Sequence, residues 1–387
     1  MNIKKNYLPS KRSFVQKFHV MDILSKANLL EKSGKKVYHL ELGEPIPFIP
    51  KTVHLEINRL LKLNKSGYTP SNGIKGLREV ISNYYKTKNI KINSEEVFIT
   101  VGSSGAFLLT FLSCFDPGDT VAIFNPSYPA YKNILKSLNI KVLEIFSDPK
   151  NNFKINLENI KKYKKINGVI ISSPNNPTGQ VFNYEELKFI YSFCKKNKIA
   201  LISDEIYHGI EFEGESFSMR TFGEETIIIN SFSKFFCMPG WRLGWVIIPK
   251  KIRENFLKLA QNIFISSGNI AQFAAIKTFD CIQEYKKNTI IYKKNRNYIF
   301  KKLDETSWRQ YTKSKGSFYT YINVSKFTED STQLVNKILT DSGVALTPGI
   351  DFDKKHGRKT LRLSFSSSFE NIRKGMNLLK KWINENY

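Results

Sequence analysis

Short apolar runs alternate with longer amphipathic stretches through the middle of the chain. Seven runs are rich in β-branched residues and almost continuously apolar, a pattern typical of strands that are buried on both faces of a sheet. These predicted strands are 97–101, 120–124, 141–146, 168–172, 200–203, 226–230 and 244–248. The stretch 185–198 has helical spacing, because Leu187, Ile190, Tyr191 and Cys194 fall at positions i, i+3, i+4 and i+7. This alternation predicts an α/β fold with a mostly parallel, doubly wound sheet of about seven strands.

The two ends of the chain have a different pattern. Residues 20–32 have helical spacing, and the chain after about residue 290 predicts a helix, a pair of strands and a final helix over 371–385. The strand pair is expected near 317–322 and 361–366. We therefore expect a smaller α+β domain built from both chain ends. The predicted division is an N-terminal segment (1–45) that packs on the small domain, a large domain (46–285) and a small C-terminal domain (286–387).

The length of 387 residues agrees with two domains. The formal net charge of +26 raises the question of an anionic partner. Most of the 60 basic residues are lysines, scattered singly or in pairs with acidic residues between the groups, whereas nucleic-acid contacts favour arginine. The charge therefore indicates a solvated lysine-rich surface, and we expect no nucleic-acid partner and only weak, salt-sensitive attraction to DNA.

Cysteine and histidine spacing argue against metal binding. The four cysteines lie far apart with no CxxC pair, and the five histidines have no metal-ligand spacing. No apolar run reaches the ~18 residues that a membrane span needs, and the polar N-terminus lacks the apolar core of a secretory signal. We therefore expect a cytoplasmic protein that binds neither metal nor membrane.

Polar residues follow four of the predicted strands, at the edge where doubly wound sheets bind ligands. A small-residue turn, 102–106, opens a helix after the first strand, and such a turn presents backbone N–H groups to an anion such as phosphate. An Asn-Asn-Pro-Thr-Gly run, 175–179, follows the fourth strand, and Asp204 and Tyr207 follow the fifth. Lys234 follows the sixth, with Arg242 shortly after it. This convergence predicts a pocket that combines an anion site, an acid and an amine.

The motifs that carry these residues resemble the class I/II aminotransferases, which are fold-type-I enzymes dependent on pyridoxal 5'-phosphate. The resemblance extends from about residue 20 to the C-terminus, with the motifs in the same order. The most specific are Ser231-Phe232-Ser233-Lys234, Gly240-Trp241-Arg242-Leu243-Gly244 and Asn175-Asn176-Pro177-Thr178-Gly179. Leu42-Gly43-Glu44-Pro45, Tyr68-Thr69-Pro70 and Arg362-Leu363-Ser364-Phe365 complete the set.

The resemblance implies catalytic roles for three residues. Lys234 would bond covalently to the aldehyde of the cofactor and, once released, would serve as the base that moves the substrate proton. Asp204 would face the nitrogen of the pyridine ring and keep it protonated. Tyr207 would donate a hydrogen bond to the ring hydroxyl oxygen, together with Asn176.

It also implies binding roles for the remaining motif residues. Tyr128 would stack on the ring, although it is also a plausible core aromatic. The phosphate would be held by Ser103, Ser104, Ser231, Ser233 and Arg242, with Tyr68 reaching it from a second subunit of a homodimer. Arg362 would bind the substrate carboxylate through two coplanar hydrogen bonds, assisted by Asn176 and the backbone of Gly43. Ser104 could instead only start a helix, and Gly43 could be part of an ordinary turn.

The implied reaction transfers the amino group of an L-amino acid to a 2-oxo acid by a ping-pong route. The neutral stretch 261–267 favours a neutral or aromatic donor over an acidic one. A C–S lyase, a decarboxylase or a synthase would use the same lysine and cofactor, so these reactions stay open at this point. A nucleic-acid-binding regulator on this fold is disfavoured, because only about 40 residues precede Gly43, too few for a separate reading domain and linker.

Position and resemblance together also predict two cis peptide bonds, Asn125–Pro126 and Asn176–Pro177, although few X–Pro bonds are cis.

Overall fold

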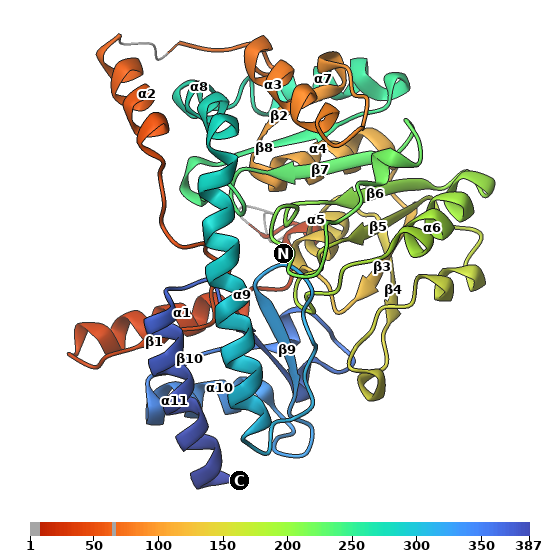
Figure 1. Cartoon of the computed structure of the whole chain (residues 1–387). Coiled ribbons are helices and arrows are strands. Elements are labelled where there is room, and N and C mark those ends of the chain that lie inside the picture. Colours follow the sequence, from red (N-terminus) through yellow and green to blue (C-terminus); the bar gives the residue numbers. More distant parts are fainter. Residues whose placement is uncertain (1–7, 64–66) are drawn as a thin grey trace, which may run out of the picture.

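A seven-stranded sheet lies at the centre of the computed structural model, which describes residues 8–63 and 67–387 (Figure 1). Its strands are β2 (Val97–Val101), β3 (Thr120–Asn125), β4 (Lys141–Phe146), β5 (Gly168–Ser172), β6 (Ala200–Asp204), β7 (Ile227–Ser231) and β8 (Leu243–Ile247). Their order is β2-β8-β7-β6-β5-β3-β4, and only β8 runs antiparallel to its neighbours. The predicted mostly parallel α/β sheet is confirmed, with strand bounds shifted by one residue at most.

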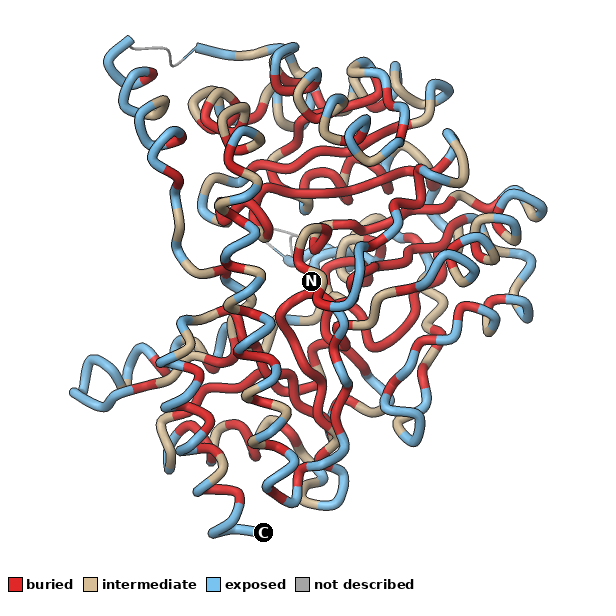
Figure 2. Tube along the Cα trace, viewed as in Figure 1, coloured by how far each residue is buried: buried red, intermediate tan, exposed pale blue. Residues whose placement is uncertain are grey.

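Both faces of the sheet are covered by helices, so every strand except the edge strand β4 is buried on both sides (Figure 2). In β3, Val121 and Ile123 belong to one apolar core, while Ala122 and Phe124 belong to the other. This alternation follows from the twofold repeat of a strand. One core includes residues of α4 (Gly102–Cys114), α5 (Pro129–Ser137) and α7 (Arg253–Ile263). The other includes residues of α3 (Lys75–Lys86), α6 (Tyr184–Lys196) and α8 (Asn269–Thr278).

The two chain ends meet in two small sheets. β1 (Tyr38–His39) pairs in parallel with β10 (Val344–Ala345). In the second sheet, β12 (Thr360–Ser364) lies between β11 (Thr347–Pro348) and β9 (Tyr319–Asn323), and both pairings are antiparallel. The helices of this region are α1 (His19–Lys32), α10 (Ser331–Ser342) and α11 (Phe369–Asn386). The N-terminal helix α1 contacts α10 and β11, so this segment packs on C-terminal elements.

A single long helix, α9 (Ile282–Asp304), runs from the level of the large sheet down to the C-terminal elements (Figure 1). The predicted boundary between residues 285 and 286 falls inside this helix. The domain limits therefore stay a prediction, and residues 1–7 of the predicted N-terminal segment lie outside the described residues. Helix α2 (Lys51–Lys62) packs against α8.

Within residues 8–63 and 67–387, three peptide bonds before proline are cis. Asn125–Pro126 and Asn176–Pro177 confirm the two predictions, and Ser173–Pro174 is a third that the sequence reasoning missed.

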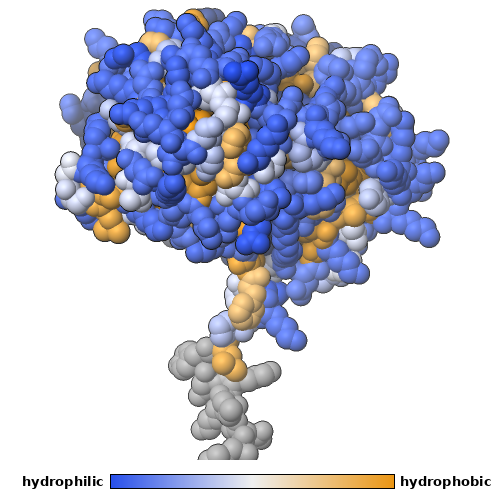
Figure 3. All heavy atoms as spheres, turned by 90° about the horizontal axis from the view of Figure 1, so that it is seen from below, coloured by the Kyte–Doolittle hydropathy of each residue, from blue (hydrophilic) through white to orange (hydrophobic). Residues whose placement is uncertain are grey.

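The surface seen in Figure 3 is mainly hydrophilic, with apolar side chains in smaller patches. Within residues 8–63 and 67–387, no helix combines the length and the apolar character needed to cross a membrane. The same residues contain no group of three or more His, Cys, Asp or Glu side chains that could hold a metal ion.

Candidate active site

A cavity of about 620 Å³ lies where the carboxyl ends of the large-sheet strands face the small sheet. Eleven of the thirteen residues predicted for the site line it: Gly43, Ser103, Ser104, Tyr128, Asn176, Asp204, Tyr207, Ser233, Lys234, Arg242 and Arg362. Ser231 lies behind Ser233, and Tyr68 lies on the surface. The fold thus brings together residues that are up to 319 positions apart, from Gly43 to Arg362.

One end of the cavity has the donors that suit a phosphate. Helix α4 begins at Gly102, earlier than expected, so Ser103 and Ser104 lie in its first turn, where backbone N–H groups are free of helix partners. A Cβ atom on Gly102 would lie 2.7 Å from Nη2 of Arg242, and Gly102 also has a φ of +64°, so glycine permits both this approach and this backbone. Arg242 itself has a φ of 52° and donates from Nη1 to the Pro239 carbonyl at 3.1 Å.

Ser231 and Ser233 extend this donor set. Their hydroxyl oxygens are 2.8 Å apart, and Ser231 also donates to the Leu243 carbonyl at 3.0 Å. Ser231 ends β7 and is only 1% exposed, so it supports Ser233 from below the cavity wall.

Lys234 lies three residues after the end of β7 and points its amine into the cavity. Nζ donates a hydrogen bond to the Gly43 carbonyl at 2.6 Å. Burial, and after it the nearby Arg362 guanidinium, lower the pKa of Lys234 to about 8. An amine with this pKa is uncharged in about a tenth of the molecules at pH 7, and the uncharged form is the nucleophile.

Asp204 is the last residue of β6 and is 3% exposed. Its carboxylate accepts hydrogen bonds from the Tyr131 hydroxyl and, at 3.1 Å, from the Ile206 amide. Burial raises the pKa of Asp204 to about 6, and the Tyr131 hydrogen bond opposes this rise. A buried carboxylate held in this way would be stabilised by a positively charged partner placed in the cavity.

Arg362 comes from β12, on the opposite wall. Its guanidinium carbon lies 4.3 Å from the centre of the Tyr319 ring and 4.8 Å from that of Phe352. Nη1 donates to Asn176 Oδ1 at 3.1 Å and Nη2 to the Glu41 carbonyl at 2.5 Å. Among the described residues, Nε has no hydrogen-bond partner although the side chain is buried. The site therefore holds a fixed cation with a spare donor, which suits an incoming carboxylate.

Aromatic side chains fill the space between these polar groups. Tyr128 packs on Phe18 with ring centres 6.3 Å apart and planes 20° from parallel. The Tyr207 hydroxyl lies 2.9 Å from that of Tyr319. Phe352 also lines the cavity.

Sequence reasoning missed four aromatic residues that line the cavity: Phe18, Tyr131, Tyr319 and Phe352. Tyr131 could have been found, because it lies in the first turn of α5, three residues after the N-cap residue Tyr128. Tyr319 lies in a strand that was predicted, but nothing in its local pattern marks it as a site residue. Tyr68, in contrast, is 85% exposed and does not reach this cavity.

Comparison with known proteins agrees with this fold. Residues 38–379 match the family described as aminotransferase class I and II. The chain is 36% identical to valine–pyruvate aminotransferase of Mycobacterium tuberculosis, over 96% of this chain and 97% of that protein. It is 40% identical to (5-formylfuran-3-yl)methyl phosphate transaminase of Methanocaldococcus jannaschii, over 96% and 98%.

Solved structures give the same result. A crystal structure of an aminotransferase from Mycobacterium tuberculosis superposes with a TM-score of 0.94 at 35% identity, covering 98% of this chain and 99% of that chain. A structure from Methanococcus jannaschii, described as similar in its active site to kynurenine aminotransferases, has a TM-score of 0.88 at 39% identity, covering 97% and 100%.

The chain therefore belongs to the class I and II aminotransferase family, whose members have fold type I and generally depend on pyridoxal phosphate. It is an aminotransferase, a transferase of nitrogenous groups. These relatives support amino-group transfer over the lyase, decarboxylase and synthase reactions that the sequence alone left open.

Proposed function

We propose that the chain is a pyridoxal-phosphate-dependent aminotransferase that takes the amino group of a neutral L-amino acid, with an apolar or aromatic side chain, and transfers it to a 2-oxo acid. The observation that carries this proposal is the meeting of Lys234, Asp204 and Arg362 in one cavity. An amine, a buried acid and a carboxylate-binding cation are the three groups that this reaction requires of the protein.

The donor set of the cavity fits this cofactor. Hydroxyl groups, free N–H groups at the start of α4 and the Arg242 guanidinium would hold the phosphate, with Ser103, Ser104, Ser231 and Ser233 as the hydroxyl donors. Asp204 would hold the proton on the ring nitrogen, Tyr207 and Asn176 would bond the ring hydroxyl oxygen, and Tyr128 would lie against the ring. When bound, the cofactor supplies an aldehyde for the amino group and an electron-withdrawing ring.

Lys234 and Arg362 would act on the substrate. Arg362, held by Asn176 and by the Glu41 carbonyl, would bind the α-carboxylate and fix the amino acid in one orientation. The Lys234 amine, with a pKa lowered to about 8, would take the proton from the substrate carbon and return it during transfer. The Gly43 carbonyl, which now accepts from Nζ, would orient the amine and the substrate.

The rest of the cavity supports a neutral donor. Apolar side chains of Phe18, Val20, Met21, Leu42 and Phe352 line it. Among the described lining residues, the lysine and arginine side chains are Lys234, Arg242 and Arg362, and each has a role already. No further cation of these types is left there for a second substrate carboxylate. A relative that acts on valine, and a structural neighbour likened to kynurenine aminotransferases, point the same way.

A homodimer completes the proposal. Tyr68 is 85% exposed, and large apolar side chains of α2 and its C-terminal cap, Leu55, Leu61 and Leu63, are at least half exposed. Apolar exposure of this kind favours burial against another subunit, and a twofold dimer is the commonest assembly. Tyr68 of a second copy would then reach the phosphate. The cytoplasmic location stays a prediction from the sequence.

The direct test combines the purified protein and pyridoxal phosphate with single amino acids and 2-oxo acids. We expect transfer from valine or an aromatic amino acid to pyruvate or 2-oxoglutarate, and slower transfer from aspartate. Transfer from aspartate alone would contradict the neutral donor, and ammonia release without a 2-oxo acid would contradict the reaction. Sedimentation should give twice the chain mass of 44.7 kDa, and a fully active monomer would contradict the dimer.

A further inference from the structure

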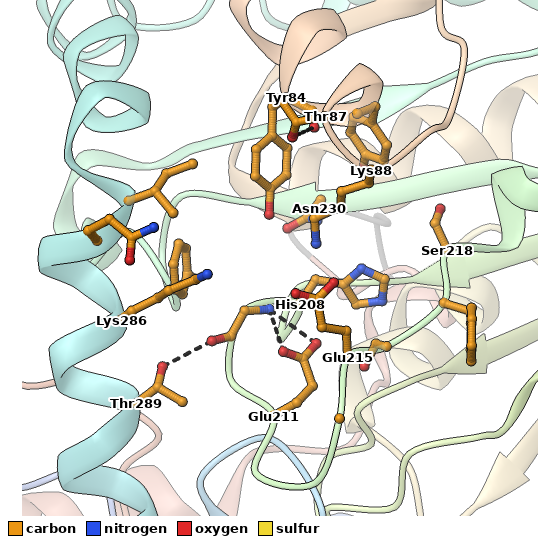
Figure 4. Close-up of a pocket in the computed structure, with 18 of the residues that line it drawn as sticks. Tyr84, Thr87, Lys88, His208, Glu211, Glu215, Ser218, Asn230, Lys286 and Thr289 are labelled. Carbon is orange, nitrogen blue, oxygen red and sulfur yellow. Dashed lines mark hydrogen bonds between the residues drawn. The ribbon is translucent and has the colours of Figure 1, made fainter.

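Figure 4 shows a second cavity, of about 1210 Å³. Its walls come from the end of α3 and the residues after it, from the loop 208–221 and from α9. Among the described residues, none lines both cavities. The roles proposed above for the active site do not use this space.

Opposite charges face each other across this cavity without pairing. Helix α9 contributes Lys286 and Lys293, and the loop contributes Glu211 and Glu215. Within the described part of the chain, none of these four side chains makes an ion pair, although 25 other pairs are present. Figure 4 shows Lys286 reaching from α9 toward the side that carries Glu211. The unpaired lysines thus lie on α9 and the unpaired glutamates on the loop, while Lys88, which acts on Glu211, and Asp280, which is paired with Lys277, also line the cavity.

Glu211 is the most enclosed of these charges. Its two carboxylate oxygens accept from the Gly209 amide at 3.1 and 3.0 Å. Burial raises the pKa of Glu211, because desolvation outweighs the opposing effects of the Ser216 side chain, the Lys88 charge and the Gly209 amide. An ammonium group beside it would offset that desolvation.

Aromatic side chains form a further part of the lining. The rings of Tyr84 and Phe279 are 5.4 Å apart, and Lys88 lies 5.1 Å above the Tyr84 ring. Phe235 forms part of the same lining and is 5% exposed. This surface suits an apolar or aromatic group.

The cavity is joined to the active site through the backbone. His208 directly follows Tyr207, and Phe235 directly follows Lys234. Both His208 and Phe235 line the second cavity, while Tyr207 and Lys234 line the first. A ligand that repositions His208 or Phe235 therefore acts on segments that carry the catalytic groups.

We propose that the second cavity binds a free α-amino acid with an apolar or aromatic side chain, as an effector, and that its binding shifts the Lys234 and Tyr207 segments. The ammonium group would lie toward Glu211 and Glu215, the carboxylate toward Lys286 and Lys293, and the side chain on Tyr84 and Phe279. A dicarboxylate would be repelled by the two glutamates, and a simple amine would leave the lysines unpaired. The proposal rests on this cavity and not on the proposed reaction.

Equilibrium dialysis of the holoenzyme variant Arg362→Met tests the binding in the second cavity. This change removes the side chain that would bind the substrate carboxylate in the active site. With labelled phenylalanine as probe, we expect about one molecule bound per chain. 3-Phenylpropionate lacks the ammonium group and phenethylamine lacks the carboxylate, so both should bind at least about tenfold more weakly. Absence of binding, or equal binding of 3-phenylpropionate, would overturn the proposal.

Second-site variants made in the same background locate the binding. Lys286→Met and Glu211→Gln should each weaken phenylalanine binding about tenfold. Lys301→Met, which removes an exposed lysine of α9 outside the cavity, should have no effect. Unchanged binding in Lys286→Met would place the ligand elsewhere and refute the assignment, even if Glu211→Gln folded poorly.

The absorbance of the bound cofactor tests the coupling. Phenylalanine should shift this absorbance in the Arg362→Met holoenzyme but not in the Arg362→Met, Lys286→Met double variant. Binding without a shift would refute the coupling. Failure of either test is distinct from failure of the proposed function, which is measured as amino-group transfer by the unaltered enzyme.

Discussion

The two cavities differ in whether their charged side chains are held by partners within the chain. In the first, Arg362 is bonded to Asn176 and Glu41, Lys234 to Gly43, and Asp204 to Tyr131. In the second, Lys286 and Glu215 make no ion pair within the described part of the chain. Fixed, pre-oriented charges suit a reaction, since they need no reorganisation in the transition state. Free charges on opposite walls suit a ligand that is itself charged at two points.

Asp204 and Glu205 give a second comparison, between two carboxylates of one dipeptide that are both held by hydrogen bonds. Asp204 lines the active-site cavity, whereas Glu205 accepts from Ser203, Ser218 and the Met219 amide on the far side. Both carboxylates are buried, and burial raises the pKa of Asp204 to about 6 and that of Glu205 to about 7. Burial and a raised pKa therefore do not by themselves distinguish a reacting group from a structural one. What distinguishes the two is whether the carboxylate faces the active-site cavity.

The largest expected effect is that of Lys234→Ala. Without the amine the chain has neither the covalent attachment nor the base, so amino-group transfer should fall by at least about 10³-fold. The fold should persist, which far-UV circular dichroism checks. Lys188→Ala, which removes an exposed lysine of α6, serves as the control and should be active. Substantial turnover by Lys234→Ala would refute the role.

The dipeptide offers the next test. Asp204→Asn should lower kcat on the order of 10²-fold, because the charge that would balance a protonated ring nitrogen is lost. Glu205→Gln removes an equally buried carboxylate one residue away and should leave kcat close to that of the unaltered enzyme. Equal losses in the two variants would show that burial, and not the cavity, explains the effect.

Glu205→Gln should instead change how stability depends on pH. Between pH 4.5 and 7 the unfolded chain has lost the Glu205 proton while the folded chain keeps it. The folded state then binds more protons, so this group lowers stability as pH rises through that window, by about 3 kcal/mol in all. Urea unfolding at several pH values should show the variant without this loss. Parallel curves for the two proteins would contradict the raised pKa of Glu205.

Arg362→Lys should have a smaller effect, confined to binding. A lysine keeps the charge but loses the planar pair of donors, so KM for the amino acid should rise about 10- to 100-fold. The value of kcat should change less, provided that Asn176 still orients the substrate. A KM close to that of the unaltered enzyme would show that another group holds the carboxylate.

The strands and the cavity residues at their carboxyl ends were predictable because their signals are local. Continuous apolar runs mark strands buried on both faces, and Asp204, Lys234 and Asn176 each follow such a run within a few residues. Parallel strands bring their carboxyl ends to one edge of the sheet, so residues that directly follow different strands lie close together. Arg362 was identified only through resemblance, since it comes from the small sheet.

Contacts between distant segments were not predictable. Phe18 packs on Tyr128 because α1 is held by Asp351, whose carboxylate accepts from the His19 and Val20 amides at 2.8 and 3.0 Å. No local pattern encodes that meeting of residues over 300 positions apart. The second cavity was missed for the same reason, because its walls come from α3, a loop and α9.

The smallest effect is expected for Tyr131→Phe, a residue that only the structure revealed. Its hydroxyl donates to Asp204, and losing it leaves the Ile206 amide as a donor to that carboxylate. The pKa of Asp204 should therefore rise, because the ionised form loses a stabilising hydrogen bond while burial is unchanged. At pH 7 or above kcat should fall by only about two- to tenfold, but the acid side of the pH–rate profile should move to higher pH, since Asp204 must be ionised to act. Tyr191→Phe, which removes a hydroxyl bonded to Glu225 at the surface, is the matched control and should leave the profile unchanged. A profile for Tyr131→Phe that loses rate without moving along the pH axis would show that Tyr131 only packs against Asp204 and does not tune it.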